Sequence, residues 1–164
     1  MARSVRDDPR VADCAAAIRS ILDGLPGDSY ELEEEIVRPH NRRGKRIDEL
    51  LSMTITPARE DAAAICVLLP VGGDAYLLTG SGERRSRYEF LRAEEPLDGE
   101  LGALVEAIVA GRIEDETVYG RGDRVVRHRT EITLADGSAV PVTSVRSVFA
   151  LRKRRERFTY RPYA

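Results

Sequence analysis

Apolar residues recur at the spacing of an α-helix between Val11 and Leu25. Asp8 and Pro9 stand just before this stretch, and these residue types are favoured at the cap and in the first turn of a helix. The chain continues with Pro26 and a glycine, which cannot extend the helix. The pattern therefore predicts a helix near the start of the chain, with its apolar stripe turned towards a core.

A second, shorter helix is predicted over residues 28–37. Asp28 and Glu31 have the spacing of a capping box, in which each side chain bonds a backbone amide of the first turn. The proline after Arg38 would end this helix, because a residue that precedes proline disfavours helical geometry. We therefore expect residues 1–38 to form a helical N-terminal part.

Residues 39–46 are polar, basic and rich in turn formers, so we expect a basic loop there. This loop separates the helical part from the remainder of the chain. The stretch that follows it, residues 47–56, has features of both a helix and a strand, and the sequence leaves its structure open.

Beyond this region, the pattern changes to short apolar or alternating runs, which are typical of strands. Three such runs, at 65–69, 76–78 and 85–91, are joined by turns too short for parallel connections, so they predict three antiparallel strands. An amphipathic helix is predicted over residues 97–109, and Gly111 is placed to cap its C-terminal end.

After this helix, the period of the pattern returns to two. Residues 126–134 alternate as one strand, residues 135–138 have the composition of a tight turn, and residues 140–151 run back. Pro141 lacks an amide donor, which places the returning strand at an edge or at a bulge. Residues 158–160 are expected to add a last short strand.

Together, these elements predict a single α+β domain over residues 1–164. We expect a mainly antiparallel sheet of five to seven strands, formed by residues 62–164 with one inserted helix, and two or three helices packed on one face. The two strand groups on either side of the inserted helix could be two halves of that one sheet.

Charge is distributed unevenly, although the 26 basic and 28 acidic residues leave a net charge of only −2. Residues 1–37 carry 4 basic and 9 acidic groups, and residues 94–116 carry 1 and 8. Residues 38–46 carry 5 basic groups and no acidic one, and residues 117–164 carry 11 and 4. The small net charge creates no global field towards nucleic acid or a membrane surface, but the segregation favours contacts between oppositely charged surfaces.

The sequence contains no motif for a metal or a cofactor. Cys14 and Cys66 lack the spacing of a zinc site or of a disulfide scaffold. His40 and His128 are the only histidines, and they form no metal-binding motif. A phosphate-loop motif is also missing, so we predict no cofactor and no metal. The start of the chain has no apolar leader, and no stretch is apolar enough to span a membrane, so we expect a cytoplasmic protein.

Residues 151–163 combine arginines with aromatic residues, a composition used by proteins that bind single-stranded nucleic acid or phosphates. With the basic loop, this segment supplies the predicted ligand-binding or partner-binding residues, which are Arg42, Arg43, Arg46, Arg154, Arg155, Arg157, Phe158 and Tyr160. The alternative is that Phe158 and Tyr160 face the core, while the arginines meet the acidic segment 94–116.

Three hypotheses for the function follow. The favoured one is a non-enzymatic protein-interaction module, comparable to small inhibitor, immunity or chaperone-like proteins, with the basic loop and residues 94–116 as docking surfaces for a protein partner. The first alternative is arginine-mediated binding of RNA, single-stranded DNA or a phosphorylated ligand. The second is a small enzyme that uses His128 with a carboxylate from a distant segment.

Overall fold

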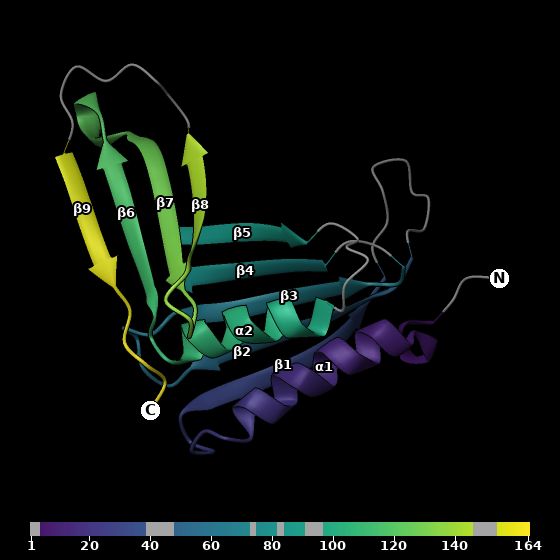
Figure 1. Cartoon of the computed structure of the whole chain (residues 1–164). Coiled ribbons are helices and arrows are strands. Elements are labelled where there is room, and N and C mark those ends of the chain that lie inside the picture. The colour runs from purple at the N-terminus through teal and green to yellow at the C-terminus, as the bar shows by residue number, and fades with distance from the viewer. Residues whose placement is uncertain (1–3, 39–47, 73–74, 82–83, 91–96, 146–153) are drawn as a thin grey trace.

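The computed structural model describes residues 4–38, 48–72, 75–81, 84–90, 97–145 and 154–164. Within these ranges, the chain is an α+β protein with two α-helices and two antiparallel sheets (Figure 1). The α+β class is therefore confirmed. The expected single sheet of five to seven strands is wrong, because the strands form one sheet of five and another of four.

The first sheet is a meander in which each strand pairs with the next one along the chain, always antiparallel. Its strands are β1 (Tyr30–Val37), β2 (Leu50–Pro57), β3 (Ala64–Pro70), β4 (Ala75–Ser81) and β5 (Arg84–Phe90). The last three correspond to the three antiparallel strands predicted from the sequence. β1 and β5 are the two edge strands of this sheet.

Both helices lie against the same face of the first sheet (Figure 1). α1 spans Pro9–Leu22, α2 spans Leu97–Val109, and the two helices pack on each other. The Asp8 side chain caps α1 by accepting a hydrogen bond from the amide of Arg10 at 3.0 Å. Gly111 follows α2 with φ of +71°, a backbone conformation that favours glycine. Both predicted caps are confirmed.

The hydrophobic core lies between the helices and this face of the sheet. Residues along β3 alternate between buried and partly exposed, because the helices cover only one face. The sheet contributes Met53, Ile55, Ile65, Val67, Leu69, Ala75 and Leu77, and the helices contribute Val11, Cys14, Ala15, Ile18, Leu22, Leu101, Leu104, Val105 and Ile108.

The second sheet stands at one end of the first, with strands that run across the direction of β1–β5 (Figure 1). It consists of β6 (Ile113–Tyr119), β7 (Val125–Thr133), β8 (Ala139–Val145) and β9 (Arg154–Thr159), in the order β8-β7-β6-β9. The predicted tight turn joins β7 to β8, with Gly137 at φ of +83°. Pro141 lies in the edge strand β8, as predicted. A last strand was expected over residues 158–160, and β9 begins earlier, at Arg154, and ends at Thr159.

The C-terminal segment joins the second sheet to the layer of helices and the first sheet. The amide of Tyr160 donates to the carbonyl of Ile113 at 3.2 Å, and the amide of Tyr163 donates to the carbonyl of Val109 at 2.9 Å. The hydroxyl of Tyr163 donates to the carbonyl of Ala63, just before β3, at 2.6 Å. This segment therefore connects three elements that are distant in the sequence.

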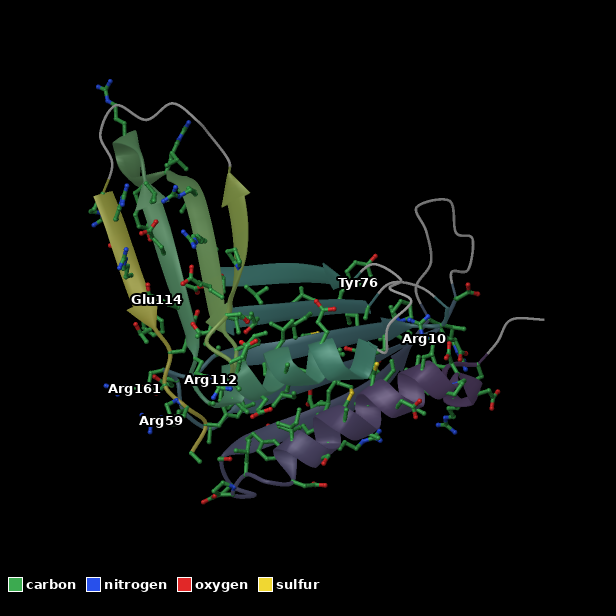
Figure 2. All side chains as sticks on the ribbon, in the orientation of Figure 1. Arg10, Arg59, Tyr76, Arg112, Glu114 and Arg161 are labelled. Carbon is green, nitrogen blue, oxygen red and sulfur yellow. The ribbon has the colours of Figure 1, made fainter. Side chains whose placement is uncertain are left out.

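The packing of the same segment leaves no space for a side chain at Gly111. A Cβ at this position would lie 2.5 Å from the backbone nitrogen of Pro162. The amide of Arg161 donates to the carbonyl of Asp61 at 2.9 Å, and Arg59 pairs with the carboxylate of Asp61 at 3.0 Å. Figure 2 shows Arg59 and Arg161 at this junction.

The predicted helix over residues 28–37 is wrong, because this segment forms β1. Leu32 and Ile36 are four residues apart, which suits a helix, but they also occupy alternate positions of a strand and pack against the core. The open stretch 47–56 forms most of its pairing partner, β2. The predicted basic loop at residues 39–46 lies outside the described residues.

Candidate functional site

The predicted binding residues fall into two groups. Arg42, Arg43 and Arg46 lie outside the residues that the structure describes. The other five lie on β9 or just after it, and they are Arg154, Arg155, Arg157, Phe158 and Tyr160.

Several of the C-terminal cations lie beside carboxylates. The Nε atom of Arg157 lies 3.5 Å from Glu116 and 4.0 Å from Glu114, which Figure 2 labels on β6. The guanidinium of Arg154 lies 3.3 Å from Glu156 and 4.8 Å from the ring centre of Tyr119. β9 pairs directly with β6, so the basic C-terminal segment and the acidic segment meet within the molecule.

Two further arginines, which lie on β7 and are not among the predicted binding residues, share the face of the sheet that carries Glu116 and Arg157. Arg127 donates to Glu116 at 2.6 Å, and Arg129 pairs with Glu131. The hydrogen bond from Arg127 holds the pKa of Glu116 below its usual range, and the charges of Arg127, Arg155 and Arg157 act in the same direction. In the sequence, Arg127 and Arg129 stand on either side of His128, and this alternate spacing is the pattern that indicates a charged face of a strand.

The two aromatic residues of the group face inwards. Tyr160 is 1% exposed, and its hydroxyl donates to Asp115 at 2.6 Å. Phe158 is partly buried and meets the Tyr160 ring edge to face, with 4.8 Å between the ring centres. The Tyr160 ring therefore presents no open face on which a base could stack.

His128 has a carboxylate close by, as the enzyme hypothesis required. Its Nε2 lies 3.6 Å from Asp115, and its Nδ1 lies 3.1 Å from the hydroxyl of Thr117. Asp115 is 1% exposed, and its two oxygens already accept hydrogen bonds from the hydroxyls of Thr130 at 2.5 Å and of Tyr160 at 2.6 Å. This arrangement is a satisfied buried network, in which the carboxylate stabilises the packing of three strands.

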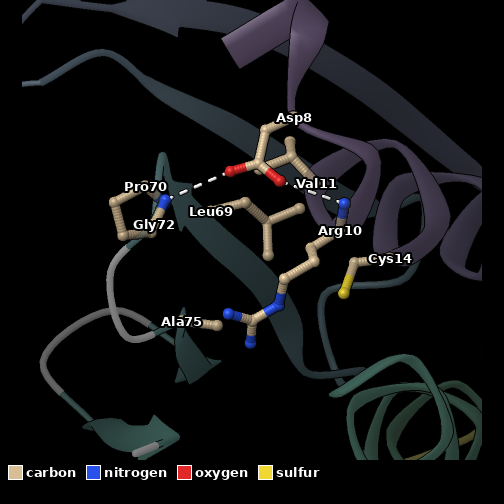
Figure 3. Close-up of a pocket in the computed structure, with 8 residues that line it drawn as sticks. All are labelled: Asp8, Arg10, Val11, Cys14, Leu69, Pro70, Gly72 and Ala75. Atoms are coloured by element: carbon tan, nitrogen blue, oxygen red, sulfur yellow. Dashed lines mark hydrogen bonds between the residues drawn. The ribbon is translucent and has the colours of Figure 1, made fainter. Parts of the chain in front are cut away.

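A small pocket near the start of α1 is also explained by structural contacts (Figure 3). One oxygen of Asp8 accepts from the amide of Arg10, and the other accepts from the amide of Gly72 at 3.1 Å. The pocket, beside Cys14 and Leu69, has a volume of about 20 Å³, which holds little more than one water molecule. The carboxylate thus joins α1 to the turn after β3.

The edge strand β1 carries a different kind of charged surface. Its register with β2 places Glu31, Glu33 and Glu35 on the face away from the helices, and Leu32, Glu34 and Ile36 on the helix face. We call Glu31, Glu33 and Glu35 the acidic row. Their cross-strand neighbours on β2 are Thr56, Thr54 and Ser52, which carry no charge.

The acidic row has no counter-charge in the described part of the chain. Its three carboxylates are exposed, and none of them forms an ion pair with a described residue. Glu34, on the other face, is paired with Arg19 through two bonds of 2.7 Å, and these bonds hold its pKa below the usual range. Among the described residues, the negative charge of β1 without an ion-pair partner therefore lies on one side of the strand.

Two neighbouring hollows follow β1 and together form what we call the edge groove. The first, about 360 Å³, lies between α1 and β1 and is lined mainly by apolar residues, among them Val11, Ala15, Ile36 and Leu51. The second, about 570 Å³, lies at the end of β1, and the two share Arg6 and Ile36. Residues 34–37 are the part of β1 that lines the edge groove, so the groove lies beside the C-terminal half of the strand.

Comparison of this chain with protein-family models, curated proteins and solved structures finds no match. Among the described residues, no group of three or more acidic, histidine or cysteine side chains is placed to hold a metal ion. Neither helix in the described ranges has the length and the apolar character that a membrane span requires. The geometry of the surfaces is therefore the basis for a functional proposal.

Proposed function

We propose that this protein is a non-enzymatic protein-interaction module that binds an extended segment of a partner along the edge of β1. The observation that carries the proposal is an eight-residue edge strand whose acidic row has no counter-charge among the described residues and whose C-terminal half borders a groove. Unpaired backbone groups of an edge strand can hydrogen-bond to an added strand, and side-chain pockets then supply specificity.

The form of β1 supports strand addition. It pairs with β2 over its full length, from Tyr30 to Val37, and its register has no bulge. Bulges and prolines are common means of protecting a sheet edge, and β8 of the second sheet contains Pro141. The sequence of β1 contains no proline, so each of its residues has a backbone amide.

A second copy of this chain is a less suitable occupant of the edge. Two β1 strands paired side by side would bring two acidic rows together on the same face. Like charges on directly paired strands are destabilising. The occupant that we propose is therefore a different protein, whose docking segment carries positive charge.

The two alternative functions have less support in the geometry. A polyanion at the second sheet would meet Arg127, Arg129 and Arg157, which already lie beside Glu114, Glu116 and Glu131. A small-molecule substrate would have to reach Asp115, which is buried and fully hydrogen-bonded. None of the three hollows described above is lined by Asp115 or His128.

Selection from a library of random displayed peptides, followed by hydrogen–deuterium exchange, tests the proposal with the full-length protein. We expect the selected peptides to slow amide exchange in β1, because an added strand protects the free amides of the edge. Selected peptides that protect the second sheet and leave β1 unchanged would contradict it. A library that yields no binder would contradict it as well.

A further inference from the structure

The register of β1 also points to the sequence of the partner. Resting on the proposed function, we infer that the docking segment alternates basic and apolar residues. Side chains of a paired strand project alternately to its two faces. The pattern of the partner therefore follows from what each face of β1 presents.

On the face away from the helices, β1 presents the acidic row. Side chains directly opposite each other on adjacent strands have Cβ atoms about 4.5–5.5 Å apart, close enough for Lys or Arg to reach a carboxylate. Glu31, Glu33 and Glu35 are two residues apart. A paired strand would meet them with every second residue, so those residues are basic.

On the helix face, β1 presents apolar surface. Leu32 and Ile36 pack against the core, and the groove beside Ile36 is lined by Val11, Ala15 and Leu51. Burying a charge against this lining would be unfavourable, whereas burying an aliphatic side chain is favourable. The intervening residues of the partner are therefore apolar.

Two charged residues limit where the pattern applies. Glu34 faces the helices but is already paired with Arg19, so it requires no further cation. Arg6 lines both hollows and shares one of them with Glu35, so it would repel a basic partner residue opposite Glu35. We therefore place the strongest preference for basic residues opposite Glu31 and Glu33.

Synthetic peptides as long as β1 test this pattern. The first alternates Lys and Val, the second has the same composition with all Lys residues before all Val residues, and the third alternates Glu and Val. Fluorescence anisotropy with the full-length protein measures the binding of each labelled peptide. We expect the alternating Lys/Val peptide to bind at least about tenfold more tightly than its block isomer, because only alternation pairs every Lys with the acidic row.

Charge reversal of the acidic row provides a second test. The triple variant Glu31→Lys, Glu33→Lys, Glu35→Lys should no longer bind the Lys/Val peptide and should bind the Glu/Val peptide instead. The matched control reverses three other exposed glutamates, Glu60, Glu100 and Glu106, to Lys. It changes the net charge equally but should keep the original preference. Circular dichroism confirms that both variants are folded.

The possible outcomes separate this inference from the proposed function. Equal binding of the alternating and block peptides would show simple charge attraction and overturn the alternating pattern. If library-selected peptides protect β1 but the Lys/Val peptide does not bind, the function stands and the pattern is wrong. Concentration-dependent self-association that the triple variant abolishes would identify a second copy as the occupant and overturn both.

Discussion

β1 and β9 are edge strands of different sheets. Both are rich in charged residues, but these charges have different surroundings. On β9, Arg157 lies beside Glu114 and Glu116 of the adjacent strand, and Arg154 lies beside Glu156. On β1, the acidic row lies opposite uncharged hydroxyl residues of β2. The charge of an edge strand is therefore available to a partner only where the neighbouring strand does not neutralise it.

The strands also differ in what holds them. β9 continues into the C-terminal segment, which bonds to β6, α2 and the residues before β3. β1 is held by its pairing with β2 and by the partial burial of Tyr30, Leu32 and Ile36. Disruption of the C-terminal segment should thus affect stability, while changes to the acidic row should affect binding.

The largest effect on stability is expected from Gly111→Ala. The new Cβ would overlap the backbone of Pro162, and an L-residue at φ of +71° is strained as well. We expect a loss of roughly 2–4 kcal/mol in the free energy of unfolding, measured by urea denaturation. The control is Gly137→Ala, which shares the positive φ but has open space around it, and it should lose only about 1 kcal/mol. Equal losses would show that the C-terminal segment does not restrict this position.

A smaller loss is expected from Tyr160→Phe, which removes a buried hydrogen bond to the carboxylate of Asp115. Hydrogen bonds to charged groups contribute about 1.5–3 kcal/mol, so urea denaturation should show a loss in that range. Tyr30→Phe in β1 is the matched control, since Tyr30 is only partly buried. A loss for Tyr160→Phe that is no greater than for the control would contradict the network described around Asp115.

Charge reversal should reduce stability in the second sheet, whereas in the first sheet it should reduce peptide binding. Glu116→Lys places a cation between Arg127 and Arg157, so we expect a loss of about 1–2 kcal/mol in the free energy of unfolding. Glu33→Lys on the exposed side of β1 should change stability by no more than about 0.5 kcal/mol but weaken binding of the Lys/Val peptide. Thermal denaturation and fluorescence anisotropy measure the two properties. A destabilised Glu33→Lys variant would show that the acidic row has a structural role.

The smallest expected effect is on the dependence of stability on pH in the acidic range. The pKa of Glu116 is lowered in the folded state, mainly by the hydrogen bond from Arg127, so its contribution to stability is present above the unfolded pKa of 4.5 and is lost as the pH falls through the folded value. Glu116→Gln should therefore reduce the dependence of stability on pH below about 4.5. In Arg127→Gln, the pKa of Glu116 should move up towards its usual value in an NMR titration. An unchanged pKa would assign the shift to another group.

The elements that depend on local patterns could be predicted from the sequence. α1 and α2 have clear apolar stripes and the correct residues at their caps, and the tight turn before β8 has a glycine where the backbone requires one. β1 could not be predicted in this way, because Leu32 and Ile36 satisfy the periods of both a helix and a strand. The pairing partner that decides between them begins at Leu50, well beyond β1 in the sequence.

The positions of the charged side chains in the candidate sites depend on strand register, which the sequence does not reveal. The acidic residues of 94–116 were expected to form a docking surface, and this stays a prediction. Within the described part of that segment, Asp115 is buried and Glu114 and Glu116 face arginines, whereas Glu100 and Glu106 are exposed. The run Glu33-Glu34-Glu35 resembles a uniformly solvated stretch in the sequence. In the structure, strand geometry directs Glu34 towards Arg19 and its two neighbours to the opposite face.

The sequence alone determined the α+β class, the two long helices and the segregation of charge along the chain. These properties follow from local periodicity and composition, which need no knowledge of distant contacts. Only the tertiary structure decided that the strands form two sheets, that Arg157 meets carboxylates of β6, and that the acidic row lies on an edge strand of the described sheet. Strand pairing joins distant segments, and a shift of one residue in register would move every side chain to the other face.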